Sequence, residues 1–211
     1  MSKKSVLVLL SGGIDSTVLA KHYLTKGYEV TGLYVDYGQK WSGEYLNFVS
    51  VVDELGISLD HVITYPIPMS VEDKFFVPMR NAHLLTVAVA YAINPKYSIH
   101  RYPNVAIGVC HGEFLDTRPE FIDRFNFMLD FCLKDPIYVL APFAHWSVER
   151  VIKYGIKIGA PLHLTRSCME YPPCGICHKC KVRQKYNIEP LPVEIILDSW
   201  YKLPMVEGKD Y

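Results

Sequence analysis

Short apolar segments alternate with longer amphipathic segments over most of the chain, and this alternation constrains the fold more than any other feature. The apolar segments, rich in Val, Ile and Leu, are residues 5–10, 28–35, 58–64, 105–109 and 137–140. The segments with helical spacing are residues 15–26, 44–55, 81–93, 118–133 and 147–158. Continuous apolar strands separated by amphipathic helices are typical of a parallel sheet with helices on both faces. The sequence therefore predicts an α/β fold with a doubly wound, mostly parallel five-stranded sheet that binds ligands at the carboxyl ends of its strands.

The alternation ends after Pro161. Residues 165–183 contain four of the six cysteines together with prolines and basic residues, and the tail that follows has little periodicity. We therefore expect residues 1–164 to form a nucleotide-binding domain and residues 165–211 to form a small zinc-binding C-terminal region packed on it. The sequence contains no internal repeat and no low-complexity linker.

The turn between the first strand and the first helix reads Ser-Gly-Gly-Ile-Asp-Ser-Thr, at residues 11–17. The two glycines let an anion approach the main chain, and the free amides and positive dipole at a helix start favour negative charge. Asp15 in this loop either caps the helix or helps to hold Mg²⁺. An ordinary capped glycine turn is the alternative, but its place at the first strand–helix junction favours a phosphate site. No Gly-Lys-Ser/Thr follows, so the loop is not a Walker loop.

Four cysteines lie close together at Cys168, Cys174, Cys177 and Cys180. Spacings of two residues allow one turn to present two sulfurs to one ion, and Zn²⁺ prefers tetrahedral thiolate sets. A site with four cysteine ligands is saturated, so we expect a structural zinc ion, with a redox pair as the alternative. His178 could replace one thiol. The basic residues nearby, Lys179, Lys181 and Arg183, either offset the charge of the zinc centre or face solvent or an anionic substrate.

Composition narrows the classes of partner and location. Basic and acidic residues balance at 22 each, and the pI is near 7.1, so no global charge favours nucleic acid as a direct partner. The apolar run at residues 5–10 is too short for a signal peptide, and no stretch approaches the roughly 18 apolar residues of a membrane span. We therefore expect a cytoplasmic protein with no membrane partner. Cys110 and Cys132 are expected to be core residues and not nucleophiles.

The loop at residues 11–16 resembles the Ser-Gly-Gly-x-Asp-Ser signature of the PP-loop ATP-pyrophosphatases, which adenylate a substrate and release pyrophosphate. Combined with the four-cysteine pattern, it resembles the 7-cyano-7-deazaguanine synthase (QueC) family. Further segments resemble that family in the same order: residues 37–39, 77–81, 108–110, 118–121, 159–162 and 165–168. The resemblance spans residues 5 to about 190.

The resemblance implies ATP-dependent synthesis of 7-cyano-7-deazaguanine (preQ0) from 7-carboxy-7-deazaguanine and ammonia through an adenylated carboxylate and an amide. It also implies ATP, Mg²⁺ and one structural Zn²⁺ per chain as cofactors, and a homodimer. The residues expected to bind the nucleotide are Leu10, Ser11, Gly12, Gly13, Ile14, Asp15, Ser16, Thr17 and Val18. Catalytic roles are expected for Asp15, Ser16 and Arg80, and substrate contacts for Tyr37, Gln39, Arg80, Asn81 and Arg118.

Alternative roles remain open for several of these residues. Arg80 could pair with a neighbouring carboxylate instead of a phosphate, and Tyr37 and Gln39 could belong to an ordinary turn. Arg118 lies at the predicted start of a helix, where a cation is unfavourable beside the dipole. Its position therefore indicates an acidic partner, for which the substrate carboxylate is one candidate.

The chain also departs from the family pattern. Val148 stands about where the family has a Lys beyond the fifth strand, with Arg150 and Lys153 as the nearby cations that can substitute. The segments before Pro78 and before Arg118 are shorter than in the family. These departures leave two alternatives, an enzyme that stops at the amide or uses a related acid, and one that activates a tRNA base for thiolation. A non-catalytic zinc-knuckle binding protein is the third.

Overall fold

A computed structural model describes residues 4–38, 43–65, 77–94, 102–111, 114–168, 170 and 173–189. The strands are β1 (Ser5–Leu9), β2 (Glu29–Asp36), β3 (Ser58–Thr64), β4 (Asn104–Ile107) and β5 (Tyr138–Leu140). The helices are α1 (Ile14–Thr25), α2 (Gly43–Leu55), α3 (Arg80–Ile93), α4 (Pro119–Cys132), α5 (Val148–Lys157) and α6 (His178–Lys185). Two short 3-10 helices, η1 (Leu115–Thr117) and η2 (Leu162–Leu164), complete the described elements.

All five strands form one parallel sheet in the order β3-β2-β1-β4-β5. This confirms the predicted five-stranded doubly wound fold. The predicted strands and helices agree with the observed ones to within about two residues at most ends, which is the usual uncertainty of element boundaries. None of the described helices is both long and apolar enough to cross a membrane.

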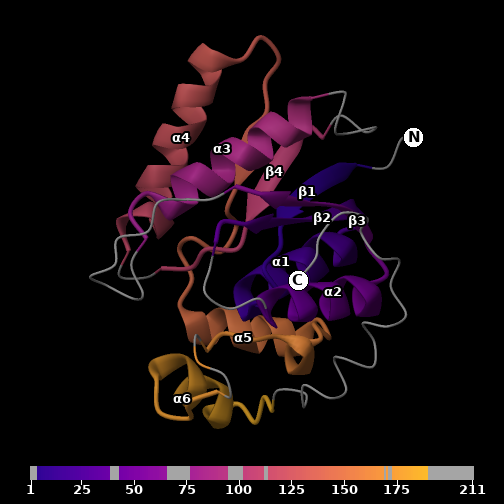
Figure 1. Cartoon of the computed structure of the whole chain (residues 1–211), viewed down its shortest axis with the longest axis vertical. Coiled ribbons are helices and arrows are strands. Elements are labelled where there is room, and N and C mark those ends of the chain that lie inside the picture. The colour runs from indigo at the N-terminus through magenta and orange to yellow at the C-terminus, as the bar shows by residue number, and fades with distance from the viewer. Residues whose placement is uncertain are drawn as a thin grey trace.

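Helices cover the two faces of the sheet, with α1, α2 and α5 on one side and α3 and α4 on the other (Figure 1). Strand β1 contributes to both cores because successive side chains of a strand point to opposite faces. Val6 and Val8 pack with the α1, α2 and α5 side, while Leu7 and Leu9 pack with the α3 and α4 side. All four are at most 7% exposed, which explains why the strand reads as a continuous apolar run.

The C-terminal region contains a helix that periodicity did not predict. Helix α6 is polar and basic, and Val182 is its one buried aliphatic residue. Val182 and Ile188 nevertheless join the hydrophobic core formed by α1, α2 and α5. In Figure 1, α6 lies beyond α5 on this side of the sheet. The boundary between residues 164 and 165 stays a prediction.

Candidate active site

The loop at residues 11–13 lies at the point where the order of the sheet changes direction. The chain moves outward from β1 through β2 and β3 on one side, and β4 and β5 extend the sheet on the other. In doubly wound sheets this reversal opens a crevice at the carboxyl ends of the two central strands, here β1 and β4. Leu10 still pairs with β2, since its N–H donates to the Leu33 carbonyl at 2.9 Å. The next residues therefore enter the crevice, and α1 begins at Ile14.

Hydroxyl groups hold the loop in shape. The N–H of Ser11 donates to the Ser16 Oγ at 3.3 Å, and that hydroxyl donates to the Gly13 carbonyl at 3.2 Å. The N–H of Gly13 donates to the Ser11 Oγ at 3.3 Å. These contacts are long for hydrogen bonds, so a bound phosphate oxygen can replace them at little cost.

Two glycines allow main chain to pack on main chain around this loop. Gly12 has φ +76°, and a Cβ there would lie 2.5 Å from the Phe48 nitrogen of α2. Gly108 follows β4 directly, and a Cβ there would lie 2.7 Å from the Ser16 nitrogen at the start of α1. Neither position can hold a larger side chain without displacing backbone. Gly108 was not among the predicted site residues, although its place after the fourth strand could have identified it.

Asp15 points a carboxylate into this crowded region. The helix N-cap is Gly13, which makes no side-chain capping bond, so the alternative role of Asp15 as a cap is wrong. Its Oδ1 is buried and has no hydrogen-bond partner among the described residues. Burial raises the pKa of Asp15 to about 6, although the positive charge of Lys179 and a contact with Cys110 lower it. The carboxylate therefore lacks a full set of partners.

The segment that leads to the cysteines runs beside the loop. The Arg166 N–H donates to the Gly12 carbonyl at 3.0 Å, and the Arg166 carbonyl lies 3.5 Å from where a Cβ of Gly13 would be. Asn47 of α2 donates its Nδ2 to the Leu164 carbonyl at 2.7 Å. The structure thus brings the phosphate loop and the approach to the cysteine cluster into contact.

The residues near position 148 explain what replaces the expected lysine. Val148, the first residue of α5, packs against the hydrophobic core. Arg150 stacks on Trp146, with its guanidinium carbon 4.1 Å from the ring centroid, so this cation is already engaged. The positive charge that acts on the Asp15 carboxylate instead comes from Lys179 of α6. No local sequence signal connects Lys179 with Asp15, because the two residues are far apart in the chain.

The predicted substrate residues divide into three groups. Tyr37 and Arg80 lie together, since the charge of Arg80 and a hydrogen bond with it lower the Tyr37 pKa, which burial raises by a larger amount. Gln39 lies outside the described residues. Asn81 is buried, and its main-chain N–H donates to the Asp116 Oδ2 at 3.0 Å while its Nδ2 donates to the Asp116 carbonyl at 2.9 Å. Asn81 therefore ties α3 to η1.

Arg118 is exposed and forms the N-cap residue of α4, directly after η1. Its side chain is thus available to an acidic group. Asp116, which links η1 to Asn81, positions this turn and was missed in the sequence, where nothing marked it out. The prediction that Cys132 is a core residue is wrong, because it is exposed at the end of α4.

The four clustered cysteines are free thiols placed for a metal ion. Their sulfurs all lie within 4.8 Å of one another, and the Cys168 and Cys174 sulfurs are 3.7 Å apart. Four sulfurs around a zinc ion at the usual Zn–S bond length are separated by roughly 3.8 Å. The geometry therefore fits a tetrahedral four-thiolate site.

Main-chain amides also favour thiolates in this cluster. The N–H groups of Cys174, Cys177 and Cys180 donate to the sulfurs of Cys168, Cys174 and Cys177, at 3.4, 3.4 and 3.5 Å respectively. Amides of Cys177 and Ile176 lower the pKa of Cys174 to about 7. Donors that stabilise the negative charge on sulfur match the needs of a metal ligand. His178 is not one of the four clustered ligands.

A phosphate loop at the reversal point of a parallel sheet, followed by a four-cysteine cluster, defines a PP-loop nucleotide-binding protein of the α/β class. Two solved structures share the fold. One is a predicted subunit of a tRNA methyltransferase from Methanocaldococcus jannaschii, with TM-score 0.52 and 20% identity over 71% of this chain and 73% of that one. The other is the U34-tRNA thiolase NcsA from Methanococcus maripaludis with its [4Fe-4S] cluster, with TM-score 0.50 and 14% identity over 99% and 77%.

The sequence comparisons are more specific. The family model for the queuosine biosynthesis protein QueC matches residues 5–73 and 64–189. The 7-cyano-7-deazaguanine synthase of Methanoculleus marisnigri is 30% identical, over 86% of this chain and 93% of the relative. The enzyme of the same name from Leptospira biflexa is 31% identical, over 89% and 91%. The chain belongs to the QueC family.

Proposed function

We propose that this chain is a 7-cyano-7-deazaguanine synthase, a carbon–nitrogen ligase that uses 7-carboxy-7-deazaguanine, ammonia and ATP. The observation that carries the proposal is the QueC match across residues 5–73 and 64–189, which includes both the phosphate loop and the cysteine cluster. The loop lies at the crevice where a doubly wound sheet binds its ligands. Fold and family therefore agree on a nucleotide-dependent reaction.

The chemistry follows from the poor reactivity of a carboxylate. A carboxylate oxygen attacks the α-phosphorus of ATP, pyrophosphate leaves, and an acyl-adenylate forms. Ammonia then attacks the carbonyl carbon, and AMP leaves with the former carboxylate oxygen to give the amide. In a second round the amide oxygen is adenylated in the same way, and loss of AMP and two N–H protons gives the nitrile. Each nitrile thus requires two ATP.

The loop supplies electrostatic stabilisation without a side-chain nucleophile. Main-chain amides and the hydroxyls of Ser11 and Ser16 would donate to phosphate oxygens as charge develops on the leaving group. Asp15 would hold Mg²⁺, which neutralises phosphate charge when bound. Its buried Oδ1, which lacks a hydrogen-bond partner among the described residues, fits this role. Lys179 would add a positive charge beside the same carboxylate.

For the second substrate we propose contacts from the two regions beyond the phosphate loop. Arg80, beside Tyr37 at the start of α3, would bind a phosphate or the acid, and Gln39 would lie nearby along the chain. Arg118 would bind the substrate carboxylate, since it is exposed at a helix start that is otherwise without an acidic cap. Asn81 would act through position, because its amide is bonded to Asp116.

The cysteine cluster would hold one structural Zn²⁺, because four thiolates leave no open position for a substrate. We also propose a homodimer, supported by the exposed aromatic pair of Phe127 and Phe131 on α4, which are 65% and 77% exposed. Apolar patches of this kind mark association surfaces. Sedimentation equilibrium should then give twice the mass of the chain. A cytoplasmic location is expected for an enzyme that consumes ATP and has six free cysteines.

An enzyme that stops at the amide is the main alternative. A thiolation route is less favoured, because burial and the Asp15 carboxylate raise the pKa of Cys110 to about 12. A thiol with that pKa is protonated at neutral pH and is a weak nucleophile.

The first half of the reaction can be tested without ammonia. Purified protein is incubated with ATP, Mg²⁺, labelled pyrophosphate and 7-carboxy-7-deazaguanine, and label is measured in ATP. We expect exchange that depends on the acid and that falls by about a hundredfold in Ser16→Ala, because a donor to the leaving group is lost. Exchange that does not need the acid, or none at any protein concentration, would contradict the proposal.

A further inference from the structure

Arg183 connects the helix of the cysteine cluster to the chain beside the phosphate loop. It lies on α6, three residues after Cys180, and is only 6% exposed. Its Nη1 donates to the Thr165 Oγ1 at 2.8 Å and its Nη2 donates to the Leu162 carbonyl at 3.3 Å. The Thr165 hydroxyl in turn donates to the Leu162 carbonyl at 2.6 Å. One guanidinium thus fixes the turn that ends η2.

From this turn only one residue separates the guanidinium from the phosphate loop. Thr165 is followed by Arg166, whose N–H donates to the Gly12 carbonyl at 3.0 Å. Gly12 is itself packed against α2, and α2 holds the Leu164 carbonyl through Asn47. A shift of Thr165 would therefore be transmitted to the loop through consecutive main-chain contacts.

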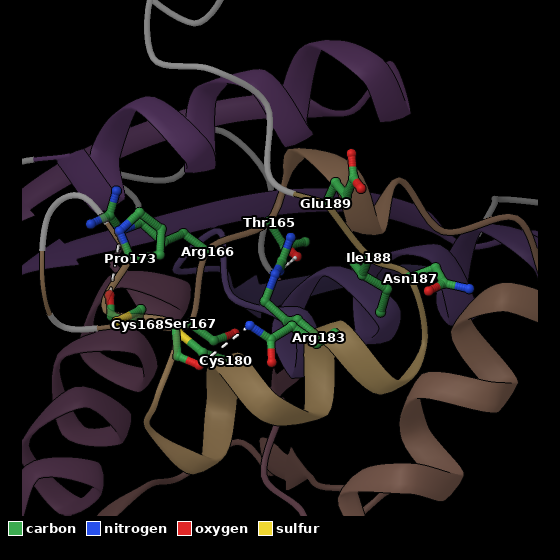
Figure 2. Close-up of a pocket in the computed structure, with 12 residues that line it drawn as sticks. Thr165, Arg166, Ser167, Cys168, Pro173, Cys180, Arg183, Asn187, Ile188 and Glu189 are labelled. Atoms are coloured by element: carbon green, nitrogen blue, oxygen red, sulfur yellow. Dashed lines mark hydrogen bonds between the residues drawn. The ribbon is translucent and has the colours of Figure 1, made fainter.

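The surroundings make these polar contacts important. A cavity of about 370 Å³ lies between α6 and the segment at residues 165–168, and Figure 2 shows Arg183 reaching toward Thr165 beside it. Side chains do not fill this space, so apolar packing cannot hold the two parts together there. The guanidinium takes over that role.

The charge of Arg183 suits the cluster next to it. Its positive charge interacts with the thiol of Cys180, and it is opposed by the neighbouring charge of Arg166. A divalent ion with four thiolates carries a net charge of about −2. Two buried guanidinium groups would balance such a centre, whereas without it they repel each other at a cost in desolvation.

We propose that Arg183 is a positioning residue that couples the four-cysteine metal centre to the phosphate loop, so that metal occupancy sets the affinity for ATP. The inference rests on the proposed function for its nucleotide but not for its second substrate. Release of the metal would free α6, loosen Arg183 from Thr165 and weaken the hold on Gly12.

Thr165→Val and Arg183→Ala break the connection from its two sides, with Lys181→Ala on the same helix as the control. Three quantities are measured on the whole chain: bound zinc, binding of a non-hydrolysable ATP analogue by calorimetry, and amide hydrogen exchange at residues 11–17. In Thr165→Val we expect full zinc content, an ATP analogue bound about ten times more weakly, which is about 1.4 kcal/mol, and faster exchange in the loop. Arg183→Lys should recover part of the affinity, since it keeps the charge and one donor.

A merely structural role predicts a different pattern. Thr165→Val with a lowered melting temperature but wild-type ATP affinity and loop exchange would overturn the proposal, even if Arg183→Ala fails to fold. In turnover assays the KM for ATP should rise while kcat changes little. If ATP analogue binding responds as expected but no deazapurine product forms, the coupling stands and the proposed function fails.

Discussion

Replacing Asp15 by Asn removes a charge from the first turn of α1 while keeping the size of the side chain. Burial raises the pKa of this carboxyl from its ordinary value of 3.8 to about 6. At 1.36 kcal/mol for each pKa unit, the difference of 6 − 3.8 corresponds to at most about 3 kcal/mol. The folded protein without ligand holds this proton more tightly than the unfolded chain does.

The sign of the effect on stability follows from this difference. A raised pKa favours the folded state below about pH 4, and that advantage is lost as pH rises through about 6. Asp15→Asn does not titrate, so its free energy of unfolding should exceed that of the wild type by up to about 3 kcal/mol above pH 7, with the excess developing between pH 4 and 6. Activity should be lost in the same variant, because the proposed Mg²⁺ ligand is missing.

Urea unfolding followed by circular dichroism at pH 5, 6, 7 and 8 measures this directly in the absence of nucleotide and Mg²⁺. Asp53→Asn, at the exposed end of α2, serves as the matched control and should show no such pH dependence. A variant at Asp15 that is equally stable or less stable than the wild type at pH 8 would refute the argument that the carboxylate is stored there at a cost to folding.

Three further substitutions test the rest of the site. Gly108→Ala should destabilise the fold by about 1–3 kcal/mol in urea unfolding, because its Cβ would lie 2.7 Å from the Ser16 nitrogen, and wild-type stability would mean that the close approach is wrong. Lys179→Ala should raise the KM for ATP about tenfold in steady-state kinetics, as expected for loss of a charged contact, while Lys181→Ala should not, and equal effects of the two would assign them to general surface charge. Cys177→Ser should reduce zinc from one ion per chain to a substoichiometric amount by elemental analysis, and an undiminished zinc content would rule this cysteine out as a ligand.

The sheet could be predicted because its signal is local. The apolar runs of the strands and the spacing of helices such as α1 and α3 reflect burial that each segment shows by itself. Helix α6 carries no such signal, since Val182 is its one buried aliphatic residue and Cys177 caps it with a sulfur that accepts from the Cys180 N–H. Its formation depends on contacts with the rest of the chain.

The site was predicted in its parts but not in its connections. The loop and the cysteines are contiguous motifs, and their chemistry follows from residue types and spacing. The pairing of Asp15 with Lys179 and of Asn81 with Asp116 joins residues distant in sequence, so no periodic pattern could reveal it. Cys132 was misplaced because a cysteine near the end of an amphipathic helix can face either side.

The central claim is that this chain builds a nitrile from a carboxylate at the expense of two ATP. The direct test incubates the protein with ATP, Mg²⁺, ¹⁵N-ammonia and 7-carboxy-7-deazaguanine and quantifies AMP and deazapurine products by mass spectrometry. The account predicts 7-cyano-7-deazaguanine carrying one ¹⁵N, with about two AMP for each nitrile, as the two adenylation steps require. An amide that accumulates with one AMP and no nitrile, or the absence of AMP at any protein concentration, would contradict it.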